Sequence, residues 1–78
     1  MDGLRVLELG CGDGRLTFRY AGSAAYVLAV DPDDKRIAEA RAGCPRELDE
    51  TVSFAVAGAA EADAPRRSFD LALFSWSL

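Results

Sequence analysis

Val6-Leu7-Glu8-Leu9-Gly10-Cys11-Gly12-Asp13-Gly14 is the stretch of sequence that decides the fold. Its first four residues are mostly apolar, which is typical of a parallel strand buried on both faces of a sheet. Glycine then occupies every second position, which indicates a turn where the backbone lies close against a ligand. A helical pattern starts at Arg15. A strand that turns over glycines into a helix directs backbone N–H groups and the positive end of a helix dipole toward a bound group, so this stretch predicts a nucleotide cradle.

Outward from this turn, segments with a strand pattern alternate with segments with a helix pattern. Strands are predicted over residues 4–9, 26–30, 51–56 and 68–74, and helices over 15–21 and from the Asp31-Pro32-Asp33-Asp34 run to Gly43. In the second helix one face carries Ile37, Ala40, Arg41 and Cys44. Strands that alternate with helices over short connections imply parallel pairing, so we expect an α/β fold.

Length and composition limit the classes of protein to which the chain can belong. Its 78 residues suffice for one small domain, and 50% of them are hydrophobic, as in globular proteins. The net charge of −4 makes nucleic acid an unfavourable partner. No apolar run approaches the roughly 20 residues that span a bilayer, and Met1-Asp2-Gly3 does not open a signal peptide, so we expect a cytoplasmic protein without a membrane partner. Cys11 and Cys44 lie far apart and the chain has no histidine, which indicates free thiols and no metal site.

Four motifs in order resemble those of the class I methyltransferase family, the Rossmann-like enzymes that use S-adenosylmethionine as methyl donor. The first is the glycine turn at residues 8–14, and the second is Val30-Asp31-Pro32 at the end of the second strand. The third runs over residues 58–65, and the fourth is Phe69-Asp70-Leu71-Ala72-Leu73. The resemblance covers nearly the whole chain and implies one cofactor-binding domain over residues 1–78, which transfers a methyl group to a small-molecule acceptor.

The resemblance also implies roles for particular residues in binding S-adenosylmethionine. Gly10 and Gly12 let the backbone lie against the methionyl part and ribose, and Asp31 accepts hydrogen bonds from the ribose hydroxyls. Glu8 holds the turn or reaches the cofactor's amino group. The implied cofactor-binding residues are Glu8, Gly10, Cys11, Gly12, Gly14, Asp31, Pro32, Ala59, Ala60, Glu61 and Ser75. Pro32, Ala59 and Ala60 would line the adenine, and no catalytic residue can be named.

One position departs from the family pattern. Ala59 stands where the family commonly has an aspartate that bonds the adenine amine, so that contact is absent unless Glu61 replaces it. We expect weaker adenine anchoring, by about 0.5 to 1.5 kcal/mol for one hydrogen bond.

The end of the chain gives a further expectation. The resemblance implies a parallel sheet in the order 3-2-1-4 whose later strands are missing, because the chain stops at Leu78 where a further helix should follow. Parallel sheets are normally covered on both faces. We therefore expect a fragment with one bare apolar sheet face, poor solubility and self-association through that face.

Several alternatives remain open. A dinucleotide site also uses glycines and an acid, but it needs a glycine or alanine where Arg15 stands. A non-catalytic or decayed cofactor-binding fragment is the second rival. Asp31 could serve only as a helix cap before Pro32, and Cys11 is interpreted as a small turn residue rather than a nucleophile. Asp70 is interpreted as structural.

Overall fold

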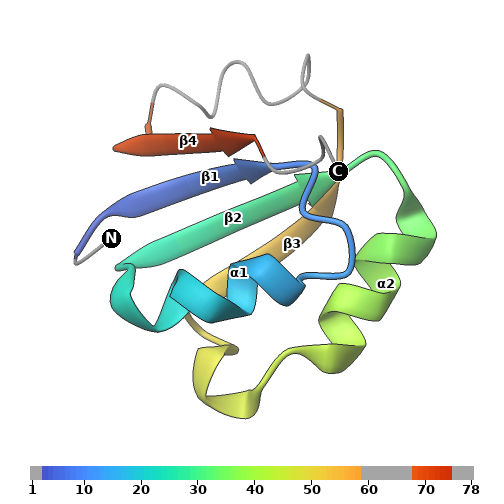
Figure 1. Cartoon of the computed structure of the whole chain (residues 1–78), viewed down its shortest axis with the longest axis horizontal. Coiled ribbons are helices and arrows are strands. Elements are labelled where there is room, and N and C mark those ends of the chain that lie inside the picture. The colour runs from blue at the N-terminus through green and yellow to red at the C-terminus, as the bar shows by residue number, and fades with distance from the viewer. Residues whose placement is uncertain (1–2, 59–67, 75–78) are drawn as a thin grey trace.

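The computed structural model describes residues 3–58 and 68–74 (Figure 1). The elements in chain order are β1 (Arg5–Leu9), α1 (Arg15–Tyr20), η1 (Ala21–Ser23), β2 (Tyr26–Asp31), α2 (Asp34–Gly43), η2 (Arg46–Leu48), β3 (Val52–Val56) and β4 (Leu71–Phe74), where η1 and η2 are short 3-10 helices. Every predicted strand and helix is present. The predicted starts of β1 and β3 are one residue too early, and the larger differences are at α2, which begins at Asp34, and at β4, which begins at Leu71.

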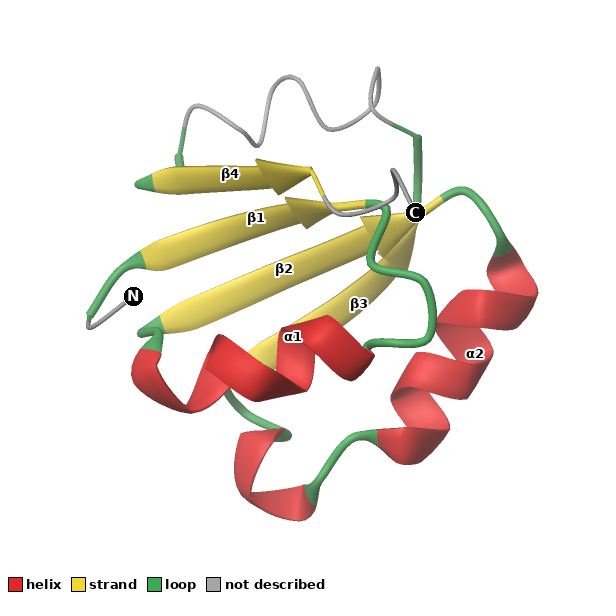
Figure 2. Ribbon diagram, in the orientation of Figure 1, coloured by secondary structure: helices red, strands yellow, loops and turns green. Residues whose placement is uncertain are grey.

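The four strands form one parallel sheet in the order β3-β2-β1-β4, which confirms the predicted α/β fold and strand order (Figure 2). At the carboxyl end of the sheet, Leu9 of β1 is in register with Val30 of β2 and with Phe74 of β4. From β1 the chain continues to β2 and β3 on one side and reaches β4 on the other. Ligands of open α/β sheets bind outside the carboxyl ends of the strands at such a reversal of direction.

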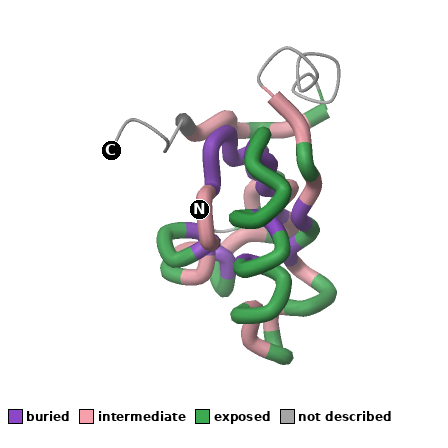
Figure 3. The backbone as a smooth tube through the Cα atoms, turned by 90° about the vertical axis from the view of Figure 1, so that its right-hand side faces the viewer, coloured by how far each residue is buried: buried purple, intermediate pink, exposed green. Residues whose placement is uncertain are grey.

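Both helices pack on the same face of the sheet (Figure 2). Because side chains alternate along a strand, every second strand residue points toward the helices. The buried residues of this core are Val6, Cys11, Ala21, Val27, Ala29, Ile37, Ala40, Val52 and Phe54. Phe18 of α1 and Phe54 of β3 meet edge to face, with ring centroids 5.9 Å apart. The first turn and the outer side of α2 remain exposed (Figure 3).

The opposite face of the sheet is buried at its centre. Leu7 and Leu9 are 0% exposed and Val30 is 3% exposed. Leu28, Ala55, Ala57 and Phe69 are partly buried against them. The expectation of a bare apolar face was therefore wrong at these central positions. Strand alternation identifies correctly which residues share a face, but it does not identify what covers that face.

A cluster at the amino end of the sheet fastens β4 to β1. Asp70 donates its backbone N–H to the carbonyl of Arg5, and its carboxylate accepts the backbone N–H of Arg5, both at 2.8 Å. Phe69 stacks on Tyr26 with centroids 6.2 Å apart, and the Arg5 guanidinium lies 5.3 Å from the Phe69 centroid. These contacts agree with the structural role expected of Asp70.

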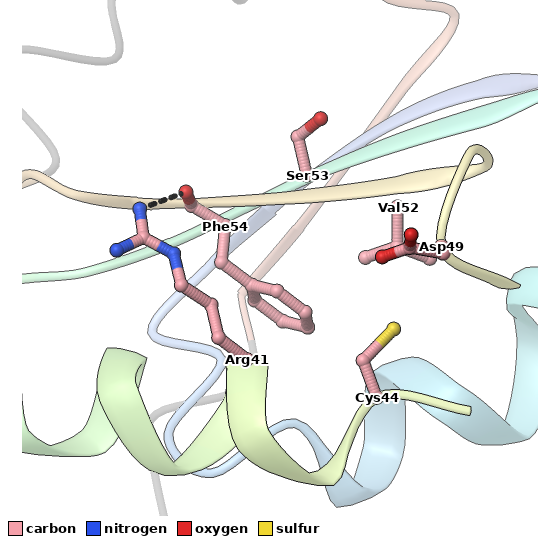
Figure 4. Close-up of a pocket in the computed structure, with 6 residues that line it drawn as sticks. All are labelled: Arg41, Cys44, Asp49, Val52, Ser53 and Phe54. Atoms are coloured by element: carbon pink, nitrogen blue, oxygen red, sulfur yellow. Dashed lines mark hydrogen bonds between the residues drawn. The ribbon is translucent and has the colours of Figure 1, made fainter. Parts of the chain in front are cut away.

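The end of α2 covers the outer edge of β3. Of the residues placed on one face of this helix, Ile37 and Ala40 are buried, while Arg41 is exposed and donates from Nη2 to the Phe54 carbonyl at 2.8 Å (Figure 4). A pocket of about 390 Å³ opens there, lined by Arg41, Cys44, Asp49, Val52, Ser53 and Phe54. Val52 and Ser53 are the first residues of β3, so this pocket lies away from the carboxyl ends of the strands. Among the described residues, no helix has the length and apolar character needed to cross a membrane.

Candidate functional site

The candidate site is the loop between β1 and α1, at the carboxyl end of the sheet. Three of its residues, Gly10, Gly12 and Gly14, have φ angles of 76°, 60° and 87°. A side chain is strained in this left-handed region, so the alternating glycines are first of all a conformational requirement of the turn. The turn that the sequence predicts is confirmed. Within the loop, Gly12 and Asp13 are partly exposed, while Gly10, Cys11 and Gly14 are buried.

The loop amides bind the end of β2. Gly10 and Cys11 both donate to the Val30 carbonyl, at 2.8 and 3.0 Å, and Gly12 donates to Oδ2 of Asp31 at 2.9 Å. The expectation that the loop directs its N–H groups toward a bound group was wrong for these three amides. The glycine spacing establishes the turn, but only the position of β2 determines which acceptors the amides meet.

Asp31 is the side chain that joins the loop to β2. It is 8% exposed, and its Oδ1 accepts the backbone N–H of Asp33 at 2.8 Å while Oδ2 accepts that of Gly12. The cap of α2 is Asp33, whose carboxylate accepts the backbone N–H groups of Lys35 and Arg36. The alternative that Asp31 serves only as a helix cap is therefore wrong. A carboxylate has about four acceptor positions, so one bond to each oxygen leaves capacity for two ligand hydroxyls.

The amino end of α1 is occupied by an acid. Asp13 accepts the backbone N–H of Arg15 through Oδ1 at 3.2 Å, and its Oδ2 lies 3.1 Å from Nε of Arg15. A dinucleotide site places a pyrophosphate on free N–H groups at a helix N-terminus. Here a carboxylate stands at that position, and it would repel a diphosphate. The geometry thus weighs against the dinucleotide alternative, in agreement with the spacing argument from Arg15.

Glu8 is buried beneath the loop and faces α1. Its Oε1 accepts hydrogen bonds from the hydroxyls of Thr17 and Tyr20, the latter at 2.6 Å. Burial, and next the bond to Glu8, raise the pKa of the Tyr20 hydroxyl well above its ordinary value. The sequence analysis assigned neither Thr17 nor Tyr20 a role at this carboxylate. Thr17 and Tyr20 are three residues apart, which places them on the same face of a helix. This spacing was the feature of the sequence that could have identified them as a pair.

Cys11 lies in the loop as a buried thiol. Burial, and then the charges of Glu8 and Asp31, raise its pKa to about 12 from an ordinary value of 9.0. Because the thiolate is the nucleophilic form, this thiol is inert near neutral pH. The interpretation of Cys11 as a small turn residue is thereby supported, and both cysteines of the chain are free.

The second and third glycines of the loop face different neighbours. A Cβ on Gly14 would lie 3.0 Å from the ring of Phe18 and 3.2 Å from Cβ of Ala40, so this glycine lets α1 pack against α2. A Cβ on Gly12 would instead lie 3.4 Å from Nη1 of Arg36. Sequence reasoning did not identify Arg36. The one feature of the sequence that pointed to Arg36 was its position in the helix that follows Asp31.

The structure describes only some of the other predicted site residues. Pro32 is exposed beside Asp31. Ala59, Ala60, Glu61 and Ser75 lie outside the described residues, so their placement as cofactor ligands stays a prediction. In the described part of the chain, Gly12 is the loop residue that lies beside both Asp31, which accepts its amide, and Arg36.

These residues fit S-adenosylmethionine in the chemistry of their donors and acceptors. Ribose hydroxyls are donors that match the remaining acceptor capacity of Asp31. A Cβ on Gly12 would lie 3.4 Å from Nη1 of Arg36, so the absence of a side chain lets a neighbouring group lie against the loop backbone there.

Comparison with known proteins agrees with this geometry. Residues 6–78 match the family described as "Methyltransferase domain". A curated relative, the ubiquinone biosynthesis O-methyltransferase of Agrobacterium fabrum, is 36% identical over 73 residues, which cover 94% of this chain and 29% of that protein. The chain thus spans less than a third of the length of this relative.

Solved structures of other proteins share the fold. A structure described as precorrin 8w decarboxylase from Methanobacterium thermoautotrophicum superposes with a TM-score of 0.80 over 94% of this chain and 40% of its own, and at 24% identity it supports the fold alone. A putative type II methyltransferase from Anaeromyxobacter dehalogenans has a TM-score of 0.72 and 31% identity over 90% of this chain and 27% of its own. Because the family match runs through residues 6–78, the chain belongs to the class I S-adenosylmethionine-dependent methyltransferase domain family and corresponds to the N-terminal portion of its relatives.

Proposed function

We propose that the chain binds S-adenosylmethionine over its glycine loop and supplies the cofactor half of an enzyme that methylates a small molecule. The hydrogen bond between Gly12 and Asp31 carries this proposal, because it holds the loop and the acid as one unit at the carboxyl edge of the sheet. Asp31 would bind the ribose hydroxyls, and the loop at Gly10 and Gly12 would lie against the ribose and methionyl part. The adenine would lie near Pro32, Ala59 and Ala60, with Glu61 and Ser75 completing the site.

The residues of this chain position the cofactor and exclude water. When bound, S-adenosylmethionine supplies a methyl group that its sulfonium has already activated. Catalysis then depends mainly on alignment of the acceptor, and proximity supplies much of the rate. Glu8 keeps the loop in place through α1, while the thiol of Cys11 stays protonated and is not a nucleophile. A general base, where the acceptor needs one, would come from outside the described residues.

A small-molecule acceptor is supported by the Agrobacterium relative, whose name describes O-methylation in ubiquinone biosynthesis. The net charge of −4 also disfavours nucleic acid as the acceptor.

A second candidate is a non-catalytic S-adenosylmethionine-binding unit. Both candidates need the same cofactor site and differ in whether methyl transfer follows binding.

Calorimetric titration separates the methyl cofactor from a dinucleotide. Circular dichroism first checks that the chain is folded. The chain is then titrated with S-adenosylhomocysteine and, in a parallel experiment, with NAD. We expect saturable binding of S-adenosylhomocysteine and none of NAD. Tight NAD binding without binding of S-adenosylhomocysteine would overturn the proposal.

A further inference from the structure

Arg36 reaches from the first turn of α2 to the glycine loop. Its backbone N–H is held by the capping carboxylate of Asp33 at 3.4 Å, which fixes the turn that carries the side chain. A Cβ on Gly12 would lie 3.4 Å from Nη1 and 4.0 Å from Cδ of Arg36. The guanidinium and the adjoining stem therefore lie against the side of Gly12 that an absent side chain leaves open.

The guanidinium of Arg36 is available to a ligand. Among residues 3–58 and 68–74, the ion pair found joins Arg15 to Asp13. Arg36 forms no ion pair with any of these residues. Its neighbour on the same helix, Arg41, is instead committed to the carbonyl of Phe54. Arg36 is also exposed, so ligand contact would not require removal of a buried partner.

Gly12 links Arg36 to the ribose side of the candidate site. The amide of Gly12 donates to Oδ2 of Asp31, the carboxylate proposed to receive the ribose hydroxyls. A group that lies against Gly12 is therefore close to the adenosine half of a ligand held by Asp31.

We propose that Arg36 contacts the adenosine half of the bound cofactor and packs its guanidinium plane against it over Gly12. This inference rests on the proposed function. A guanidinium is flat and weakly hydrated, and it stacks on aromatic faces such as a purine. Arg36 is then a binding residue that acts together with Asp31, on the same side of the ligand as Gly12.

The experiment compares Arg36→Ala, Arg36→Lys and Lys35→Ala, with two ligands each. S-adenosylhomocysteine contains both halves of the cofactor, and 5′-methylthioadenosine contains the adenosine half without the amino acid. We expect Arg36→Ala to weaken both ligands by the same factor, about 3- to 30-fold, as for loss of a guanidinium on an aromatic face. Arg36→Lys keeps the charge without the plane and should lose nearly as much. Lys35→Ala removes a neighbouring exposed cation and should bind both ligands as the unaltered chain does.

Each contrary result has a separate meaning. Unchanged or tighter binding by Arg36→Ala would overturn the contact, and tighter binding would identify the side chain as an obstruction in the site. Loss of affinity for S-adenosylhomocysteine alone would place the contact at the methionyl carboxylate and overturn the adenosine assignment. Full rescue by Arg36→Lys, or equal loss in Lys35→Ala, would overturn planar packing in favour of a charge effect. Failure of the unaltered chain to bind S-adenosylhomocysteine would instead overturn the proposed function, and this inference with it.

Discussion

At the scale of single residues, the carboxylate of Asp31 has two roles that a substitution removes together. It braces two backbone amides, of Gly12 and Asp33, and it is proposed to bind the ribose. We expect Asp31→Ala to weaken S-adenosylhomocysteine binding by about 1 to 3 kcal/mol, the range for loss of a charge-assisted acceptor. Calorimetric titration measures the change, with Asp34→Ala, an exposed acid in the first turn of α2, as the control. A dissociation constant that stays the same in Asp31→Ala would reduce Asp31 to a backbone brace.

The buried thiol of Cys11 makes a prediction about pH. Its pKa is raised to about 12 in the folded chain from an ordinary 9.0, so the folded state holds the proton more tightly than the unfolded state does. Its contribution to stability is therefore complete below about pH 9 and is lost as the pH rises toward 12. The free energy of unfolding in urea should fall over this window, and Cys11→Ala should reduce the slope. Tyr20 and Cys44 have pKa values raised in the same direction, so some slope remains in the variant. A free energy of unfolding that rises with pH over this window would contradict the assignment.

Local sequence patterns identified the backbone of the site better than its side-chain contacts. The alternating glycines and the acid at the end of β2 were predictable, because each follows from the sequence near one strand end. The contact of Arg36 with Gly12, and the bonds from Thr17 and Tyr20 to Glu8, depend on how a helix packs on the sheet. No spacing along the chain determines such a contact.

At the scale of elements, the helix and strand boundaries show where local patterns become ambiguous. Asp31 and Asp33 flank Pro32, and either acid could have capped the next helix. The structure assigns the cap to Asp33, because β2 extends through Asp31 and turns that carboxylate toward the loop.

The contact between β1 and α1 can be tested by removing one hydroxyl. Tyr20→Phe keeps the ring of α1 in place and deletes the O–H that donates to the buried carboxylate of Glu8. We expect the free energy of unfolding to fall by about 1 to 3 kcal/mol, because a buried charged acceptor loses a partner. Urea denaturation measures it. Tyr26→Phe is the matched control, since it should retain the ring stacking on Phe69 and cost little. Equal losses in the two variants would show that the Tyr20 hydroxyl does not stabilise the contact.

At the scale of the whole molecule, the sheet has buried side chains on both faces, although α1 and α2, the helices of the described residues, both lie on the same face. The sequence predicts the alternation that separates Leu7 and Leu9 from Val6 and Glu8. The apolar run predicts that Leu7 and Leu9 are buried, as they are, but it does not predict what covers them, because that cover includes residues distant in sequence, Phe69 among them. Self-association through this face therefore stays a prediction, and the fully exposed apolar centre expected for it is not found at Leu7 or Leu9.

A core substitution distinguishes a buried second face from a bare one. Leu7 is 0% exposed, so Leu7→Ala should leave a cavity and lower the free energy of unfolding by about 2 to 5 kcal/mol. In a domain of this size such a loss is a large share of the total, which is about 5 to 15 kcal/mol for native proteins. Leu16→Ala is the matched control, because Leu16 is 47% exposed on α1 and its truncation should cost little. Urea denaturation of both variants, with midpoint and slope fitted together, gives the comparison. If Leu7→Ala costs no more than Leu16→Ala, the second face is open to water in solution, and the sequence-based expectation of a bare face would be restored.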